Sequence, residues 1–122
     1  MSFDSKALDA HIALFNKAVT SGDFSAFTAS FAPDAVMKFA GVPAGPYLGR
    51  DAIASAYAEN PPDDTMTVLS HDWDGDRLIA RFKWDSGGMG QLSLRWRENL
   101  VTQLFIAFDP HPLPQEKEPT GE

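Results

Sequence analysis

Residues 66–108 read MTVLSHDWDGDRLIARFKWDSGGMGQLSLRWRENLVTQLFIAF, a pattern that predicts four β-strands joined by three tight hairpins. Asp74-Gly75 is the first hairpin signal, because this pair tolerates the positive φ angles of a two-residue turn. A turn centred there sets His71 opposite Leu78, and it places Leu69 on the same face of the sheet. This shared face is predicted to be largely apolar and to line the interior.

The two later hairpins extend the apolar face. A three-residue loop in the second hairpin sets Phe82 opposite Leu92, whereas a two-residue loop would interrupt the apolar pattern. The last hairpin, with regular pairing, turns Gln103 toward the inner face. A β-bulge in the final strand would instead place Thr102 and Leu104 on the inner face and turn Gln103 away from it. The pattern leaves both registers of the final strand open.

The first part of the chain predicts an amphipathic helix, because Leu8, Ile12, Phe15 and Val19 repeat at spacings of four, three and four. His11 lies beside this apolar stripe rather than within it. A histidine in such a position is more often a partly buried helix residue than a catalytic base. We therefore expect His11 to have a structural role.

Two covering segments follow before the next helix. Phe24, Phe27 and Phe31 repeat at spacings of three and four, which predicts a second, shorter helix that Pro33 ends. Residues 34–39 then predict a short strand. The helix and the strand are both expected to turn their aromatic side chains toward the interior.

A loop and a third helix complete the covering segments. Residues 41–49 contain three glycines and two prolines, so this stretch is predicted to be a loop without regular structure. Residues 50–60 resume helical spacing, and Pro61-Pro62 ends this helix because proline supplies no helical N–H. The covering layer is therefore predicted to contain three helices.

Helices followed by a meandering antiparallel sheet predict an α+β fold. Three N-terminal helices with apolar stripes are expected on one face of a strongly curved, mostly antiparallel sheet of four or five strands. This arrangement would leave a conical cavity. Residues 1–109 are predicted to form a single domain, and residues 110–122, rich in proline and glutamate, a flexible tail.

Composition excludes several classes of function. The net charge of −7 disfavours binding to a phosphate backbone, so no nucleic-acid partner is expected. The chain has no cysteine, and its three histidines lack carboxylates at ligand spacing, so no metal site and no cofactor are expected. With neither an apolar leader nor a membrane-spanning stretch in this sequence, we expect no membrane partner and a cytoplasmic location.

Three short motifs carry a resemblance to a known family. They are the stretches at residues 20–24 (TSGDF), 31–36 (FAPDAV) and 49–53 (GRDAI). Together with the terminal hairpins, they resemble the nuclear transport factor 2-like (NTF2-like) superfamily, in its SnoaL-like and ketosteroid-isomerase-like branch, over residues 5–108. The resemblance implies a cone-shaped α+β barrel and a homodimer packed through the outer face of the sheet. Members include isomerases, polyketide cyclases, epoxide hydrolases and dehydratases, as well as binding modules without catalysis.

The resemblance also tests steroid isomerase chemistry residue by residue. That chemistry needs a carboxylate base and two acidic donors for an oxyanion. This sequence has Phe39 near the base position, Phe15 where a donor tyrosine would lie, and Leu92 near the second donor. Ketosteroid isomerase activity is therefore not expected.

A pocket for a small apolar ligand is predicted on the concave face. His71 is the catalytic candidate there, because an imidazole titrates near neutrality, at about pH 6.5. The alternative is a histidine that packs on Trp73 or bonds a backbone carbonyl. Tyr57 or Gln103 would orient a carbonyl of the ligand. The predicted pocket residues are Phe15, Phe39, Tyr57, His71, Leu92 and Gln103.

Two functions therefore remain open. One is a cofactor-independent isomerase, cyclase or hydrolase that acts by proton transfer on an apolar compound. The other is a non-catalytic module for ligand binding or dimerisation, which the shortage of ionisable groups in the predicted pocket favours. The outer face of the sheet mixes apolar and cationic residues, which suggests a partner surface or a solvated face. The residues of this outer face are Ile79, Arg81, Lys83, Ser93 and Arg95.

Overall fold

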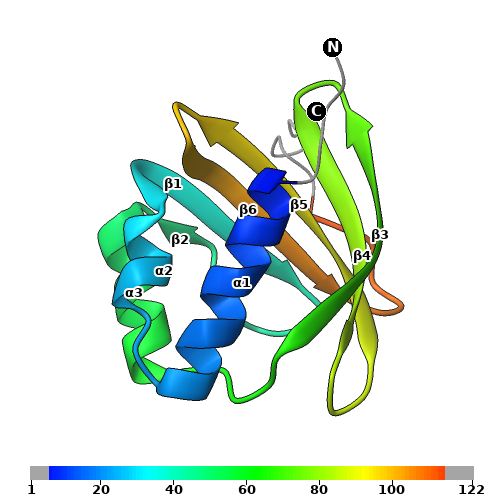
Figure 1. The fold of residues 1–122 in the computed structure, drawn as a ribbon, viewed down its shortest axis with the longest axis horizontal. Coiled ribbons are helices and arrows are strands. Elements are labelled where there is room, and N and C mark those ends of the chain that lie inside the picture. The colour runs from blue at the N-terminus through cyan, green and yellow to red at the C-terminus, as the bar shows by residue number, and fades with distance from the viewer. Residues whose placement is uncertain (1–5, 115–122) are drawn as a thin grey trace.

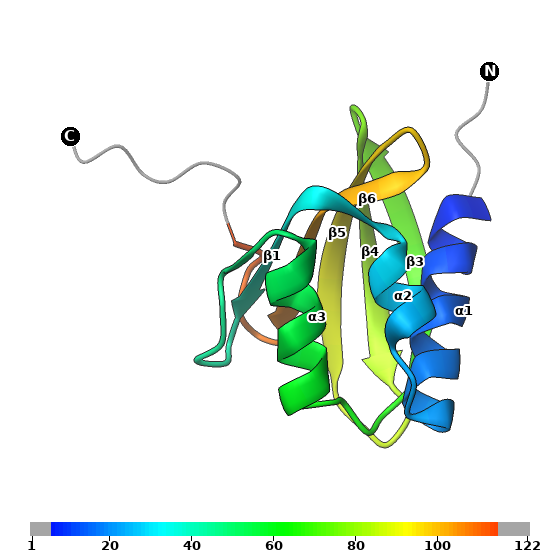
Figure 2. The ribbon, with the colours of Figure 1, turned by 90° about the vertical axis from the view of Figure 1, so that its left-hand side faces the viewer.

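The computed structural model describes residues 6–114 of the chain, and in them three helices pack on one face of a mixed sheet. Figures 1 and 2 show all three helices on the same side of this curved sheet. The predicted α+β class is therefore confirmed. In chain order the elements are α1 (Lys6–Ser21), α2 (Ser25–Ala29), β1 (Phe31–Ala40), β2 (Tyr47–Leu48), α3 (Arg50–Glu59), β3 (Met66–Asp74), β4 (Arg77–Trp84), β5 (Met89–Arg97) and β6 (Leu100–Phe108).

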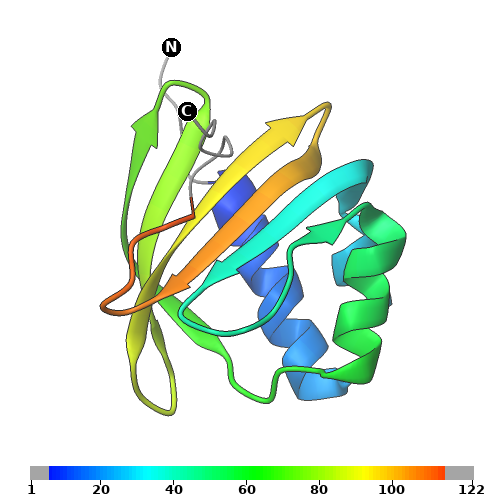
Figure 3. The ribbon, with the colours of Figure 1, turned by 180° about the vertical axis from the view of Figure 1, so that it is seen from behind.

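The strand order within residues 6–114 is β2-β1-β6-β5-β4-β3. β1 and β6 run parallel, and the other neighbours are antiparallel. The sheet has six strands, more than predicted, and it is curved but open, with β2 and β3 at its edges. Figure 3 shows the face that the helices do not cover.

The second helix is shorter than predicted. α2 ends at Ala29, and Phe31 begins strand β1 opposite Val101 of β6. The backbone N–H of Val101 donates to the carbonyl of Ser30 over 2.9 Å. Helical spacing alone predicts Phe31 in a helix. The residue is extended instead because β6 supplies hydrogen-bond partners for an extended backbone. Phe31 is completely buried in that position.

The glycine- and proline-rich segment also contains more structure than predicted. Tyr47 and Leu48 form the short strand β2, which pairs with Met37 and Val36 of β1. The prediction of a segment without regular structure is therefore wrong for these two residues. β2 brings Tyr47 to the edge of the sheet next to the cavity described below.

The first hairpin turns one residue later than predicted, about Gly75-Asp76 rather than Asp74-Gly75. Of the two central residues only Gly75 has a positive φ, 65°, which is where a type II′ turn places glycine. The register therefore moves by two residues, and His71 pairs with Ala80 instead of Leu78. Because side chains alternate with a period of two, the predicted face of His71 is unchanged.

The second hairpin shows the same kind of shift. Phe82 pairs with Gly90 rather than with Leu92, and Leu92 pairs with Ala80. The move again spans two residues, so the concave face keeps its predicted members. The side chains of this face that are at most 1% exposed are Leu78, Ala80, Phe82, Leu92, Leu94 and Leu104.

Two register irregularities reverse the predicted direction of side chains. In β3 a shift between Val68 and Ser70 leaves Leu69 49% exposed, so the prediction that Leu69 faces inward is wrong. In the last hairpin a second shift pairs Gln103 with Arg95 on the outer face and turns Leu104 inward. The bulged alternative is therefore the observed one.

Helix α1 buries a face slightly rotated from the predicted stripe. Leu8 and Phe15 are buried as predicted, but His11 and Ala18 join them, and Ile12 is only half-buried. None of the helices within residues 6–114 is long and apolar enough to cross a membrane. The predicted tail, residues 110–122, lies outside the described residues from position 115 onward.

Candidate functional site

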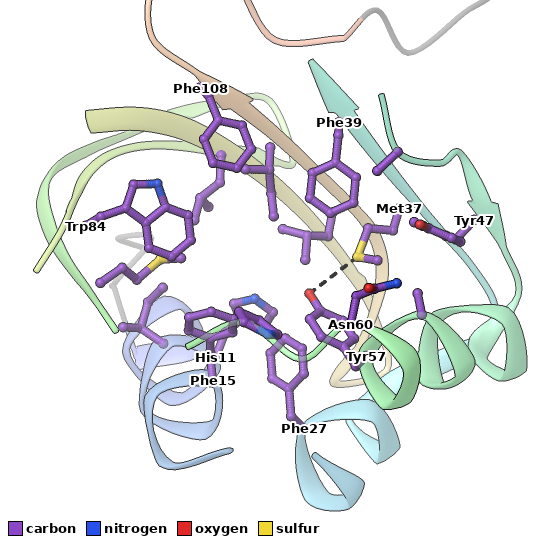
Figure 4. Close-up of a pocket in the computed structure, with 18 residues that line it drawn as sticks. His11, Phe15, Phe27, Met37, Phe39, Tyr47, Tyr57, Asn60, Trp84 and Phe108 are labelled. Carbon is purple, nitrogen blue, oxygen red and sulfur yellow. Dashed lines mark hydrogen bonds between the residues drawn. The ribbon is translucent and has the colours of Figure 1, made fainter. Parts of the chain in front are cut away.

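A cavity of about 280 Å³ lies between the helices and the concave face of the sheet. Figure 4 shows its side chains converging from both layers. Among the described residues that line it, none carries a carboxylate, an ammonium or a guanidinium group. The lining consists of His11, Ile12, Phe15, Phe27, Met37, Phe39, Ala44, Tyr47, Ala56, Tyr57, Asn60, Pro62, Met66, Trp84, Leu92, Leu104, Ile106 and Phe108.

The cavity has two walls of different origin. Strands β1, β4, β5 and β6 supply the sheet wall, which we define as Met37, Phe39, Trp84, Leu92, Leu104, Ile106 and Phe108. The helices supply the helical wall, which we define as His11, Ile12, Phe15, Phe27, Ala56 and Tyr57. In Figure 4 Phe39 and Phe108 lie opposite His11, Phe27 and Tyr57.

Aromatic contacts fix the shape of the cavity. The Trp84 ring stacks on that of Phe108, with ring centroids 5.9 Å apart and an angle of 15° between the ring planes. The centroid of the Phe15 ring lies 6.2 Å from that of the same indole. Elsewhere Phe39 meets Tyr47 edge-on at 6.3 Å. Such pairs hold one another in preferred orientations, so the aromatic surface presented to a ligand is largely preformed.

His11 is the buried titratable group of the helical wall. Its side chain is 5% exposed, and its ring lies 5.1 Å from that of Phe27 and 6.1 Å from that of Phe31. Burial lowers the pKa of His11 to about 4, because the charged form loses its hydration there. His11 is therefore neutral at pH 7. Its buried Nδ1 atom has no hydrogen-bond partner among the described residues.

Tyr57 is the second polar group of the helical wall. It is 7% exposed and stacks on Phe24, with ring centroids 5.1 Å apart. Its hydroxyl donates to the sulfur of Met37 over 3.5 Å, and thioether sulfur is a weak acceptor. Burial, and secondarily the nearby Tyr47, raises the pKa of Tyr57, so the hydroxyl stays protonated at neutral pH.

Four of the six predicted pocket residues line the cavity. They are Phe15, Phe39, Tyr57 and Leu92. Phe15, Phe39 and Leu92 are also the three positions where the resemblance would place the groups of a steroid isomerase, and each presents an apolar side chain to the cavity. The described lining thus contains no carboxylate to serve as that base.

His71 and Gln103 are not among the lining residues, and their predicted placement is corrected. His71 lies on the edge strand β3, where its side chain is exposed. The geometry therefore does not support its predicted role in proton transfer inside the cavity. Gln103 faces outward because of the irregularity in the last hairpin, and Leu104 takes the predicted inward place.

Sequence patterns assigned no ligand role to several residues that prove to line the cavity. His11 is predicted to have a structural role because it lies beside the apolar stripe, but the buried face of α1 is rotated so that it includes His11. Trp84 and Phe108 end the strands β4 and β6, and their rings stack although β5 lies between these strands. Alternating apolar residues near the end of β6 were the available signal for Phe108.

His11 and Tyr57 are poorly matched to acid–base catalysis at neutral pH. Acid–base catalysis is most efficient when the pKa of the catalytic group lies near the working pH. The pKa values of His11 and Tyr57 are shifted away from neutrality in opposite directions. Among residues 6–114 there is also no group of three or more His, Cys, Asp or Glu side chains that could hold a metal ion.

Comparisons with known proteins agree with this geometry. The family model of the SnoaL-like domain matches residues 12–98. No curated protein sequence matches the chain. A candidate isomerase from Bacillus subtilis superposes with a TM-score of 0.72 at 15% identity, over 89% of this chain and 91% of that one.

Two further solved structures share the architecture. A candidate polyketide cyclase from Sinorhizobium meliloti gives a TM-score of 0.63 at 22% identity, over 88% of this chain and 100% of that one. An NTF2-like protein of unknown function from Burkholderia xenovorans gives 0.64 at 18% identity, over 96% of this chain and 98% of that one. At these identities the likenesses establish the fold alone.

Proposed function

Because the chain belongs to the SnoaL-like domain family, we propose that it binds a small, uncharged and largely apolar molecule in the cavity between the helical wall and the sheet wall. The observation that carries the proposal is an aromatic lining without a charged side chain among its described residues. Ligand sites are typically concave and mostly apolar, with a few polar groups that fix orientation. His11, Tyr57 and Asn60 are polar groups of this kind.

A cofactor-independent isomerase, cyclase or hydrolase is the second candidate. The structural relatives described as a candidate polyketide cyclase and a candidate isomerase support it. The titratable side chains of the described lining are His11, Tyr47 and Tyr57. Burial holds His11 and Tyr57 in their neutral forms, which makes His11 a weak base and Tyr57 a weak acid. The electrostatics of the cavity therefore favour binding over turnover.

Filling the cavity from α3 tests the binding proposal. Ala56 lines the cavity, whereas Ala58 on the same helix is exposed. We expect Ala56→Phe to weaken binding of the uncharged fluorophore N-phenyl-1-naphthylamine by about tenfold or more, because the new ring occupies the ligand's space. The control Ala58→Phe makes the same change outside the cavity. Equal affinity in both variants and the unmodified protein would contradict binding at this site.

We also propose that a second copy of the chain packs on the outer face of β4 and β5. The helices leave this face of the sheet uncovered (Figure 3), and half-buried Ile79 and Arg81 lie there beside Ser93. Mixed apolar and cationic surfaces are common in protein interfaces. Light scattering should then give twice the chain mass of 13.3 kDa. A mass equal to one chain at micromolar concentration would exclude a stable pair.

A further inference from the structure

His11 is a polar side chain held in apolar surroundings. Its ring lies against Phe27 and Phe31, and only 5% of the residue is exposed. Its Nδ1 atom has no hydrogen-bond partner among the described residues. A buried polar atom in this condition costs roughly 1–3 kcal/mol. A leucine would fill such a place in a helix without that cost, so the position is better suited to a ligand than to stability.

Tyr57 offers a second polar group to the same space. Its ring meets Phe27 edge-on at 5.3 Å, and the His11 ring meets Phe27 at 5.1 Å. Both rings therefore flank one phenylalanine, and Figure 4 shows both directed toward the cavity. Within residues 6–114, the acceptor of the Tyr57 hydroxyl is the thioether of Met37. A ligand oxygen is a stronger acceptor than thioether sulfur, so Tyr57 gains by exchanging one for the other.

The chemistry of these two groups defines the ligand group that fits them. A neutral imidazole has one N–H donor and one acceptor nitrogen, and a phenol hydroxyl both donates and accepts. A hydroxyl on the ligand satisfies either tautomer of His11, because it can donate to the bare nitrogen or accept from the N–H. A carboxylate or an aliphatic amine would be charged at pH 7, and no described residue of the lining carries a compensating charge.

We propose that the ligand is an aromatic or alicyclic alcohol, whose neutral hydroxyl hydrogen-bonds with His11 and Tyr57 while its ring system lies against the sheet wall. This inference rests on the proposed binding function and adds the class of ligand to it. The helical wall then recognises one oxygen, and the sheet wall recognises apolar surface. His11 and Tyr57 act as specificity-determining residues.

A matched pair of probes tests the inference, namely naphthalene and 2-naphthol, which differ by one hydroxyl. In fluorescence titrations of the full chain, we expect His11→Leu to lower the affinity for 2-naphthol by about tenfold and to change the affinity for naphthalene by less than about twofold. Tyr57→Phe should lower the affinity for 2-naphthol by about threefold and should also leave the affinity for naphthalene within about twofold. His71→Leu, which replaces an exposed histidine, should change neither.

The hydroxyl subsite would be overturned if the variants lost affinity for both probes in equal proportion, or if they kept full affinity for both. Binding of naphthalene to the unmodified protein would still support the cavity as a binding site. Failure of both probes to bind the unmodified protein would overturn the two proposals together. Melting curves accompany each titration, since a partly unfolded variant would lose both probes. If His11→Leu folds poorly, the ratio of the two probe affinities in Tyr57→Phe tests the hydroxyl subsite instead.

Discussion

The two walls of the cavity differ in how their backbones are bonded and in the chemistry of their side chains. Leu92 and Leu104 of the sheet wall are at most 1% exposed, and their strands lie in one continuous hydrogen-bonded sheet. The helical wall instead carries His11 and Tyr57, a histidine and a tyrosine with shifted pKa values. Under the proposed binding function, the sheet wall would set the shape that a ligand must have, and the helical wall would set its polar group.

This division follows from how each element satisfies its backbone. Helices bond their own N–H and C=O groups, so exchanging one side chain on a helix leaves the backbone hydrogen bonds of its neighbours intact. In the sheet, inward residues pack against residues on adjacent strands, as Phe39 of β1 does edge-on against Tyr47 of β2 at 6.3 Å. Stability should therefore depend more on the sheet wall and its supports, and ligand selectivity more on the helical wall.

The largest effect is expected beneath the sheet wall. Phe82 is completely buried and supports Trp84, so Phe82→Ala should lower the free energy of unfolding by about 4 kcal/mol through lost burial and a new cavity. The control is Leu69→Ala in the neighbouring strand, where 49% of the side chain is exposed, with an expected loss below about 1 kcal/mol. Urea unfolding followed by tryptophan fluorescence measures both. Similar losses would contradict the expectation that burial beneath the sheet wall sets the stability.

A smaller, pH-dependent effect is expected in the helical wall. Burial lowers the pKa of His11 from 6.5 to about 4, so between these values the unfolded chain takes up a proton that the folded protein does not. Stability therefore falls as pH falls through this window, by about 3 kcal/mol in total from this group. At pH 7 His11→Leu should be as stable as the unmodified protein or more so.

The pH effect is read as a difference between variants. Urea unfolding at several values between pH 4 and 7 should give a flatter profile for His11→Leu than for the unmodified protein. Carboxylates that titrate in the same range contribute equally to both and cancel. A slope that His11→Leu leaves unchanged would show that His11 takes up its proton in the folded state.

Alternation predicted the faces of most strands but not their registers. The first two hairpins shifted by two residues, which preserved the faces of His71 and Phe82, because a strand repeats every second residue. Leu69 and Gln103 were assigned to the wrong face, because each lies at a register irregularity that inverts the alternation. The sequence allowed the second of these irregularities without requiring it.

Periodicity limited the interpretation of the helices in a similar way. The spacing of apolar residues in α1 fits two adjacent faces, and only packing against the sheet buries His11 instead of Ile12. Phe31 satisfied a helical spacing, yet its backbone pairs with β6, which is distant in sequence. Local spacing cannot report a partner that lies some 70 residues away along the chain.

By itself the sequence determined the fold class, the three covering helices, and an apolar inner face that includes Phe15, Phe39, Tyr57 and Leu92. These features depend on periodic patterns within single elements, and such patterns are visible locally. Only the tertiary structure decided that His11 enters the cavity and that His71 and Gln103 stay outside it. The reason is physical, because contacts between distant segments fix the rotation of a helix, the order of the strands and their register. These contacts rotate His11 inward, place His71 on the edge strand β3, and turn Gln103 outward by a shift of one residue.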